Sequence, residues 1–239
     1  MIGAQGARPP VCVIVGVGPG NGAAFARRFA AEGYAVALIA RRPEPIKVLA
    51  AELPNARGYA CDVTDAASVE SIFARIRAEL GDPDALVYNA GKGVWGDVEK
   101  VTAQDFEDAW RSNTLGAFLA ARQVVPAMKA HQRGDIIFVG ATASRRGVAG
   151  TAAFAPAKAA QKSLAESLAR HLGPAGVHVA LIIVDGVVGG PETRSQFPDR
   201  AEDQFIKPEA IAEIAFQLTR QDRSAWSFEV DARPFNEKW

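Results

Sequence analysis

The chain has 239 residues, of which 49% are hydrophobic and 23% charged, a composition typical of a globular protein with a well-filled core. Its 27 basic residues balance 27 acidic ones, so no net charge would draw it to nucleic acid or an anionic membrane. No apolar run approaches the roughly 18 residues of a membrane helix, and the first ten residues do not resemble a secretory signal. The two cysteines, Cys12 and Cys61, lie in apolar runs, which indicates buried free thiols and favours a cytoplasmic protein.

The first predicted element is a buried strand over residues 11–15, which leads through a glycine-rich turn into a helix. Glycines let the backbone turn tightly and approach a pyrophosphate, whose charge the free N–H groups at the helix start stabilise. Two registers of a dinucleotide-binding motif fit: Gly18-x-Gly20-x-x-Ala23, and the more widely spaced Gly16-x-x-x-Gly20-x-Gly22. The alternative interpretation is a plain turn.

A second buried strand over residues 34–40 ends at Arg41 and Arg42. An acidic side chain at this point would bind the ribose 2′-hydroxyl of NAD, whereas Ala40 and two arginines offer room and charge for a 2′-phosphate. The sequence therefore favours NADP over NAD. The alternative is that both arginines belong to a solvated strand end.

Strands and helices alternate along the rest of the chain. The first half predicts a helix over 45–53, a strand over 58–65, a helix over 66–80 capped by Thr64 or Asp65, and a strand over 84–91. In the second half we expect a helix over 102–131 with a kink before Pro126, a strand over 134–140 and a small-residue loop over 141–150. A helix over 151–172 and a strand over 176–184 follow. The chain then continues as a mobile loop over 187–207, a helix from Pro208 and a strand over 225–230. This alternation is typical of a parallel sheet with helices on both faces. His131, His171 and His178 fall far apart in this layout, so no metal site is expected.

With Gly16-x-x-x-Gly20-x-Gly22, Asp62, Asn89-Ala90-Gly91, Asn113 and Phe154-x-x-x-Lys158, the chain resembles the short-chain dehydrogenase/reductase family over nearly its full length. The resemblance implies an α/β fold: a single Rossmann domain over residues 1–239, with a doubly wound, parallel, seven-stranded sheet and helices on both faces. It also implies a substrate loop over 187–207, a small-molecule substrate, and a homodimer or homotetramer.

The resemblance further implies where the cofactor binds. Asp62 would hold the adenine, Asn89 to Gly91 would support the cofactor, and Lys158 would bond the nicotinamide ribose. The full expected set is Gly16, Gly18, Gly20, Asn21, Gly22, Arg41, Arg42, Asp62, Val63, Asn89, Ala90, Gly91, Lys158, Gly186 and Val188.

Catalysis in this family uses a serine that hydrogen-bonds the substrate carbonyl, a tyrosine that donates the proton, a lysine that lowers the tyrosine pKa, and an asparagine that holds a water in the proton relay. Asn113 and Lys158 match. The tyrosine position, four residues before the lysine, holds Phe154, and the serine position after the fifth strand holds Ala141. The family's proline-glycine after the sixth strand has become Asp185-Gly186.

Loss of a general acid typically costs ~10²–10⁴ in rate, so ordinary carbonyl reduction is expected to be slow. The favoured hypothesis is an NADP(H)-dependent oxidoreductase in which Asp185, Thr142, Lys92 or a group of the substrate supplies the proton. The alternative is a non-catalytic NADP(H)-binding sensor or partner subunit. Trp95 and the 187–207 loop indicate a pocket with apolar walls around an unidentified substrate.

Overall fold

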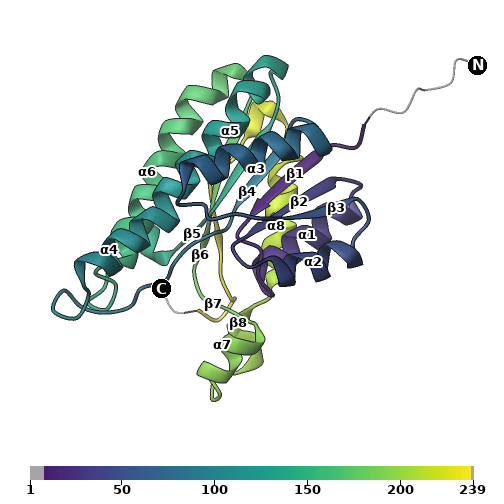
Figure 1. Ribbon diagram of the computed structural model, residues 1–239. Helices are drawn as coiled ribbons and strands as arrows, with labels where there is room; N and C mark the ends of the chain where they lie inside the picture. Colours follow the sequence, from purple (N-terminus) through teal and green to yellow (C-terminus); the bar gives the residue numbers. More distant parts are fainter. Residues whose placement is uncertain (1–7, 238–239) are drawn as a thin grey trace, which may run out of the picture.

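A seven-stranded sheet forms the centre of the computed structural model, which describes residues 8–237 apart from the side chains of residues 191 and 192 (Figure 1). The strand order is β3-β2-β1-β4-β5-β6-β9, and every neighbouring pair is parallel. This confirms the predicted α/β architecture. The strands are β1 (Val11–Val15), β2 (Ala35–Ala40), β3 (Ala56–Ala60), β4 (Ala85–Tyr88), β5 (Asp135–Ala141), β6 (His178–Val184) and β9 (Glu229–Ala232).

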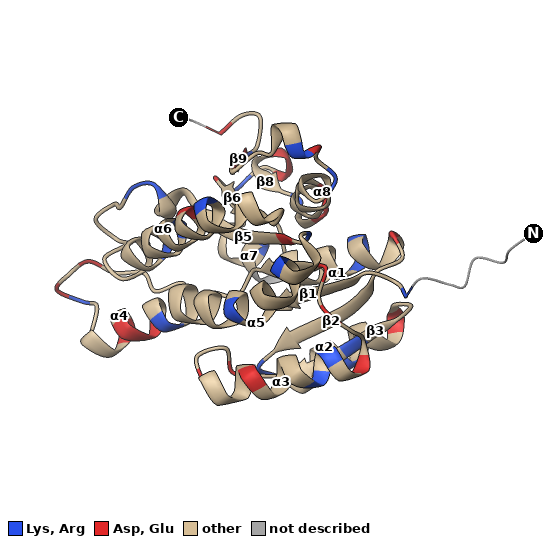
Figure 2. Cartoon of the chain, turned by 90° about the horizontal axis from the view of Figure 1, so that it is seen from above, with Lys and Arg blue, Asp and Glu red and all other residues tan. Residues whose placement is uncertain are grey.

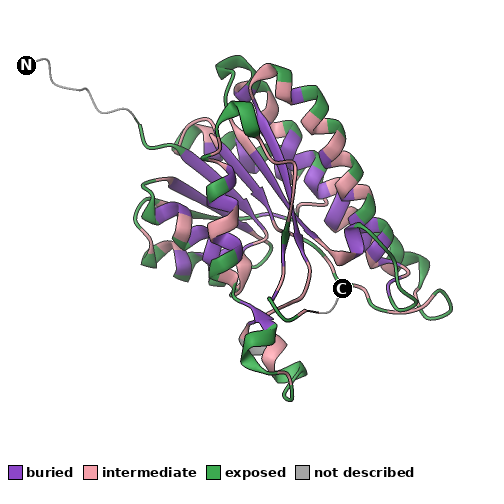
Figure 3. Ribbon diagram, turned by 180° about the vertical axis from the view of Figure 1, so that it is seen from behind, coloured by how far each residue is buried: buried purple, intermediate pink, exposed green. Residues whose placement is uncertain are grey.

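Helices cover both faces of this sheet because successive strand residues point to opposite sides. In β1, Val11, Val13 and Val15 face one apolar core, while Cys12 and Ile14 face the other. Figure 3 shows the buried strands between the two helical layers. The first core packs against α3 (Ala66–Glu79), α5 (Gly116–His131) and α6 (Phe154–Leu172), and the second against α1 (Asn21–Ala31), α2 (Pro43–Glu52) and α8 (Pro208–Leu218).

Three strands differ from the prediction by three residues or more at one end. The strand predicted over 84–91 is β4, which ends at Tyr88, so Asn89 to Gly91 follow it. The third strand is β3, which ends at Ala60 rather than at residue 65, so Cys61 and Asp62 follow it in a turn. Here the Asp62 side chain accepts the backbone N–H of Thr64, a local bond that competes with strand pairing. The last strand is Glu229–Ala232 rather than 225–230, because the chain first forms a short 3₁₀ turn over Arg223–Ala225.

The predicted helix over 102–131 is two helices, α4 (Ala103–Trp110) and α5, joined by a π-helical turn over Arg111–Leu115. The break from regular α-helix lies at this turn, and α5 continues through Pro126 as one element. Similarly, α6 begins at Phe154 instead of residue 151, because the Thr151 hydroxyl bonds the backbone of Val148.

The segment 187–207 was expected to be an aperiodic loop, and the structure corrects this. It contains β7 (Val187–Val188), α7 (Pro191–Gln196) and β8 (Phe205–Ile206), with β7 and β8 paired in parallel. Arg194 forms an ion pair with Glu202 and lies over the Phe205 ring. These elements are too short to produce a periodic pattern, which is why the sequence does not reveal them. Figure 1 shows them projecting beyond the sheet.

Both signs of charge are spread over the outer helices and loops (Figure 2). Cys12 and Cys61 are buried free thiols, as expected. Within residues 8–237, no helix is both long and apolar enough to cross a membrane.

The start of α1 depends on close contact at Gly22, where an added Cβ would lie 2.6 Å from both the Gly16 carbonyl oxygen and Val17 Cα. We predict that Gly22→Ala lowers the free energy of unfolding by about 1–3 kcal/mol, because backbone atoms cannot move aside. Gly18→Ala is the matched control: its Cβ would meet no atom within 4 Å, so a change within about 0.5 kcal/mol is expected. Urea denaturation measures both, and equal effects would contradict the packing argument.

Candidate functional site

The glycine-rich turn after β1 packs directly against the end of β4. Gly16 has φ +90°, and a Cβ there would lie 2.4 Å from the backbone nitrogen of Ala90, so a side chain is excluded on two grounds. The Asn89 Nδ2 donates a hydrogen bond of 2.8 Å to the Gly16 carbonyl. This bond fixes the turn at the carboxyl end of the sheet, where doubly wound folds bind their ligands.

Three adjoining cavities lie along this edge, and Asn89 lines all of them. The glycine-loop cavity, of about 380 Å³, lies over Gly16 to Gly22. The strand-end cavity, of about 830 Å³, lies beyond β2 and β3, and the Lys158 cavity, of about 490 Å³, lies between the end of β5 and α6. Every residue predicted for the cofactor or catalytic site lines at least one of the three, except Asp185.

The strand-end cavity gathers Arg41, Arg42 and Asp62. Asp62 Oδ1 accepts hydrogen bonds from the backbone N–H of Thr64 at 2.9 Å and from its hydroxyl at 2.8 Å. These bonds, aided by the charges of Arg41 and Arg111, hold the pKa of Asp62 below its ordinary value. The cavity thus presents an ionised carboxylate at one wall and two guanidinium groups at another.

The Lys158 cavity has a buried cation at its base. Lys158 Nζ donates to the Val139 carbonyl at 2.8 Å and to Gln161 Oε1 at 3.1 Å. Lys158 is 6% exposed, and burial lowers its pKa to about 8. The ammonium is therefore held by two neutral acceptors, with no carboxylate contributing to its pKa.

Asn113 lies on the π-helical turn and is fully buried. Its Nδ2 donates to the carbonyls of Lys92 and Ala109, which fixes the orientation of the amide. Its Oδ1 has no hydrogen-bond partner in the described part of the chain and points at Gly91, where a Cβ would lie 2.5 Å away. A buried acceptor in this state favours a bound ligand or water beside it.

The walls of the Lys158 cavity are apolar. The rings of Phe154 and Trp95 pack with centroids 5.2 Å apart, and Lys158 Nζ lies 6.0 Å from the Phe154 ring centroid. Ala141 also lines the cavity. Ser144 turns away, because its Oγ accepts the backbone N–H of Ala141 at 3.1 Å.

Thr142 lines the cavity and its hydroxyl donates to Asp185 Oδ1. Asp185 itself lies behind Thr142, with its other oxygen 3.4 Å from Arg233. Lys92 forms an ion pair of 2.7 Å with Asp108 and lines the strand-end cavity instead. Of the proposed side-chain proton donors, the structure therefore brings only Thr142 to the Lys158 cavity, with its proton directed at a carboxylate.

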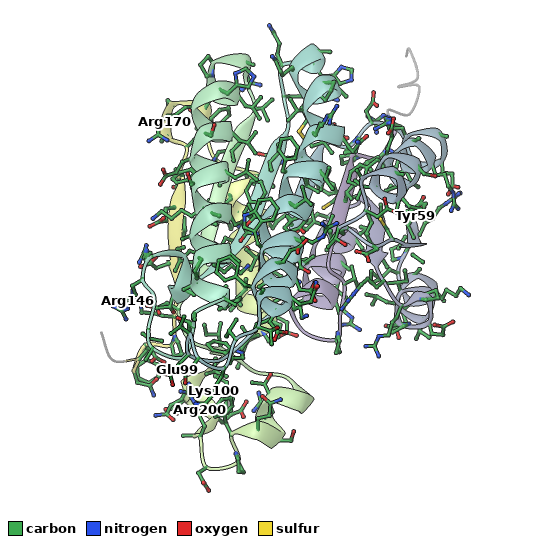
Figure 4. All side chains as sticks on the ribbon, turned by 60° about the vertical axis from the view of Figure 1, so that its left-hand side comes forward. Tyr59, Glu99, Lys100, Arg146, Arg170 and Arg200 are labelled. Carbon is green, nitrogen blue, oxygen red and sulfur yellow. The ribbon has the colours of Figure 1, made fainter. Side chains whose placement is uncertain are left out.

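Sequence reasoning did not identify Gln161 or Arg146. Gln161 is fully buried one turn after Lys158, and its signal was a polar residue within an otherwise apolar helix face. Arg146 lines the Lys158 cavity with its exposed side chain directed outward in Figure 4. Within residues 8–237 there is no group of three or more potential metal ligands, and His178 contacts Asp135 and Ser227 instead.

Comparison with known proteins gives concordant matches. A family model described as short chain dehydrogenase matches residues 10–200. The 3-oxoacyl-(acyl-carrier-protein) reductase MabA of Mycobacterium tuberculosis is 31% identical over 233 residues, covering 92% of this chain and 91% of that protein. The crystal structure of a short-chain dehydrogenase from Rhodopseudomonas palustris has a TM-score of 0.83 at 31% identity, covering 96% of this chain and 100% of that one. A metagenomic short-chain oxidoreductase in complex with NADP has a TM-score of 0.83 at 28% identity, covering 96% and 99%.

The buried ammonium of Lys158 predicts a pH-dependent stability. Its pKa is about 8 in the folded chain and ~10.4 when unfolded, so above pH 8 the folded state releases a proton that the unfolded state keeps. The free energy of unfolding should therefore rise with pH between about 8 and 10 in the wild type relative to Lys158→Met. Urea denaturation of both proteins over this range tests it. A difference that does not change with pH would contradict a depressed pKa.

Proposed function

The chain belongs to the short-chain dehydrogenase family, and we propose that it is an NADP(H)-dependent oxidoreductase whose catalytic centre departs from the usual one of that family. The observation that carries the proposal is the position of Lys158 and Asn113, buried and fixed at the base of an apolar cavity that adjoins the glycine loop. A nicotinamide ring in that cavity would face an apolar substrate. MabA, a relative over most of the chain, is a reductase by name.

Several features support NADP(H) as the cofactor. The glycine-loop cavity offers backbone N–H groups at the start of α1 for a pyrophosphate. The strand-end cavity supplies Asp62 for the adenosine and the guanidinium groups of Arg41 and Arg42 for a 2′-phosphate. The metagenomic relative was solved with NADP. The cofactor itself supplies the hydride, and the residues named here bind and orient it.

The catalytic centre keeps two of the four side chains that the family uses. Phe154 has no proton to donate, Ala141 has no hydroxyl, and the Thr142 hydroxyl donates to Asp185. We therefore place the source of the proton in the substrate or in water that enters from the cavity side. The substrate is a small molecule with an apolar body, matched to the walls formed by Trp95 and Phe154.

The second candidate is a non-catalytic NADP(H)-binding sensor or partner subunit. The same absence of a hydroxyl at Phe154 and Ala141 supports it. The two candidates differ in one measurement, the consumption of NADPH. An oxidoreductase consumes NADPH with some member of a panel of ketones, imines, quinones and enones, whereas a sensor binds NADPH and consumes none with any of them. The expected homodimer or homotetramer stays a prediction.

Arg41→Ala and Arg42→Ala should each weaken NADPH binding and leave NADH binding nearly unchanged. A charge-assisted hydrogen bond contributes about 1.5–3 kcal/mol, so each loss should raise the Kd for NADPH about 10- to 100-fold. Fluorescence titration of both cofactors measures this. Arg170→Ala is the matched control, because Arg170 lies on α6 towards the opposite end of the molecule (Figure 4). Equal losses for NADPH and NADH would argue against a 2′-phosphate site.

The double variant Ala141→Ser, Phe154→Tyr should gain carbonyl reductase activity. The new tyrosine would stand one helical turn from Lys158, whose charge lowers the tyrosine pKa, and the new serine would supply a hydrogen bond to the carbonyl. We expect turnover of apolar ketones to rise at least about 10²-fold, as for restoration of a general acid. NADPH consumption, followed by absorbance, gives the rate. Intact NADPH binding without any gain would show that more than these two groups is missing.

A further inference from the structure

We propose that Gln161 is a positioning residue that locks Lys158 in place and closes the internal route by which a proton would reach that lysine. The inference deepens the proposed function and rests on it. It concerns where the proton in this site can come from, and it adds a residue for which neither the sequence motifs nor the comparisons give a role.

Gln161 bridges Lys158 and Asn113, the two residues of the site that match the family's pattern. Its Oε1 accepts a hydrogen bond from Lys158 Nζ at 3.1 Å, and its Nε2 donates one of 3.0 Å to the backbone carbonyl of Asn113. Gln161 and Asn113 are fully buried, and Lys158 is 6% exposed. The chain Lys158–Gln161–Asn113 therefore runs through the interior, on the side of Lys158 away from the cavity opening.

The direction of these hydrogen bonds decides whether a proton can pass along the series Lys158, Gln161 and Asn113. A water or a hydroxyl both accepts and donates at one oxygen, so it passes a proton along a chain. A carboxamide accepts at oxygen and donates at nitrogen, and neither atom gains or loses a proton near neutral pH. Gln161 thus connects Lys158 and Asn113 by hydrogen bonds without connecting them for proton transfer.

The resemblance to the family indicates which step of proton transfer Gln161 would block. There, an asparagine holds a water in the proton relay. Here, the Gln161 amide donates to one lone pair of the Asn113 backbone carbonyl and stands between that carbonyl and Lys158 Nζ, where a relay water would need room. The remaining acceptor of Lys158, the Val139 carbonyl, cannot take up a proton either.

Lys158 is consequently a fixed cation and hydrogen-bond donor, and any exchange of its protons goes through the cavity. This agrees with the rest of the site, where Phe154 and Ala141 bring no proton and Thr142 directs its own at Asp185. Ala141, Thr142 and Phe154 therefore share one property: none of them directs a proton into the cavity.

Crystal structures of two variants test the placement. Gln161→Ala opens space between Lys158 and Asn113, whereas Gln161→Met removes the hydrogen bonds and keeps most of the volume. We expect an ordered water within hydrogen-bonding distance of both Lys158 Nζ and the Asn113 carbonyl in Gln161→Ala and none in Gln161→Met. A Gln161→Ala structure in which the space collapses without water overturns the inference.

Kinetics test the function. Gln161→Ala and Gln161→Met are each added to the Ala141→Ser, Phe154→Tyr background, and NADPH-dependent reduction of an apolar ketone is followed as a function of pH. With the relay position open, the alanine variant should turn over at least about tenfold faster than its parent, with kcat affected more than KM, while the methionine variant should not. A purely structural role for Gln161 predicts that both additions lower activity alike.

Each outcome bears on one claim. If the alanine and methionine additions behave alike, or if the alanine addition gives no gain while NADPH binds normally, the inference is wrong. If the wild-type protein binds no NADPH in the same titration, the proposed function fails, and the crystal structures still decide the placement of Gln161. Thermal unfolding of every variant confirms that the compared proteins are folded.

Discussion

The burial of one ammonium group governs the arrangement of the site. Taking the charge of Lys158 out of water is costly unless its N–H groups are bonded, and the Val139 carbonyl and the Gln161 amide meet that need. Gln161 in turn occupies the Asn113 carbonyl, and the Asn113 side chain requires that residue 91 be glycine. The need to bond this ammonium thus connects four parts of the chain: the end of β5, helix α6, the π-helical turn and the segment after β4.

The fold could largely be predicted because its buried strands and amphipathic helices leave apolar patterns that are visible in the sequence. Buried parallel strands such as β1 and β6 are continuous apolar runs, and α3 and α8 show a clear apolar face. The two strands with the largest errors, β3 and β9, are edge strands, whose exposed faces weaken the apolar pattern. The elements within 187–207 were missed because two-residue strands are defined by their partners, not by their own residues.

For the site, the sequence indicated the positions but not the connections. The resemblance to the family assigned Asn113, Phe154 and Lys158 to one site, and all three line the Lys158 cavity. It could not indicate that Asp185 lies behind Thr142, since one rotation about a strand end decides which side chain faces the cavity. Nor could it single out Gln161, whose role depends on contacts with residues distant in the chain.

The number of residues in the π-helical turn at Arg111–Leu115 sets the orientation of the side chains on either side of it. Such a turn holds one residue more than an α-helical turn, and each residue of an α-helix advances by about 100° around the axis. The apolar faces of α4 and α5 are accordingly out of phase: Ala109 packs towards Ala153 and Ala157, while Ala117 and Ala121 face the main core. Loss of one residue between Asn113 and α5 would restore a regular α-helix and turn Asn113 by about 100° relative to α5, so its amide would no longer face Gly91. The number of residues in this turn therefore matters to the site as much as the identity of Asn113.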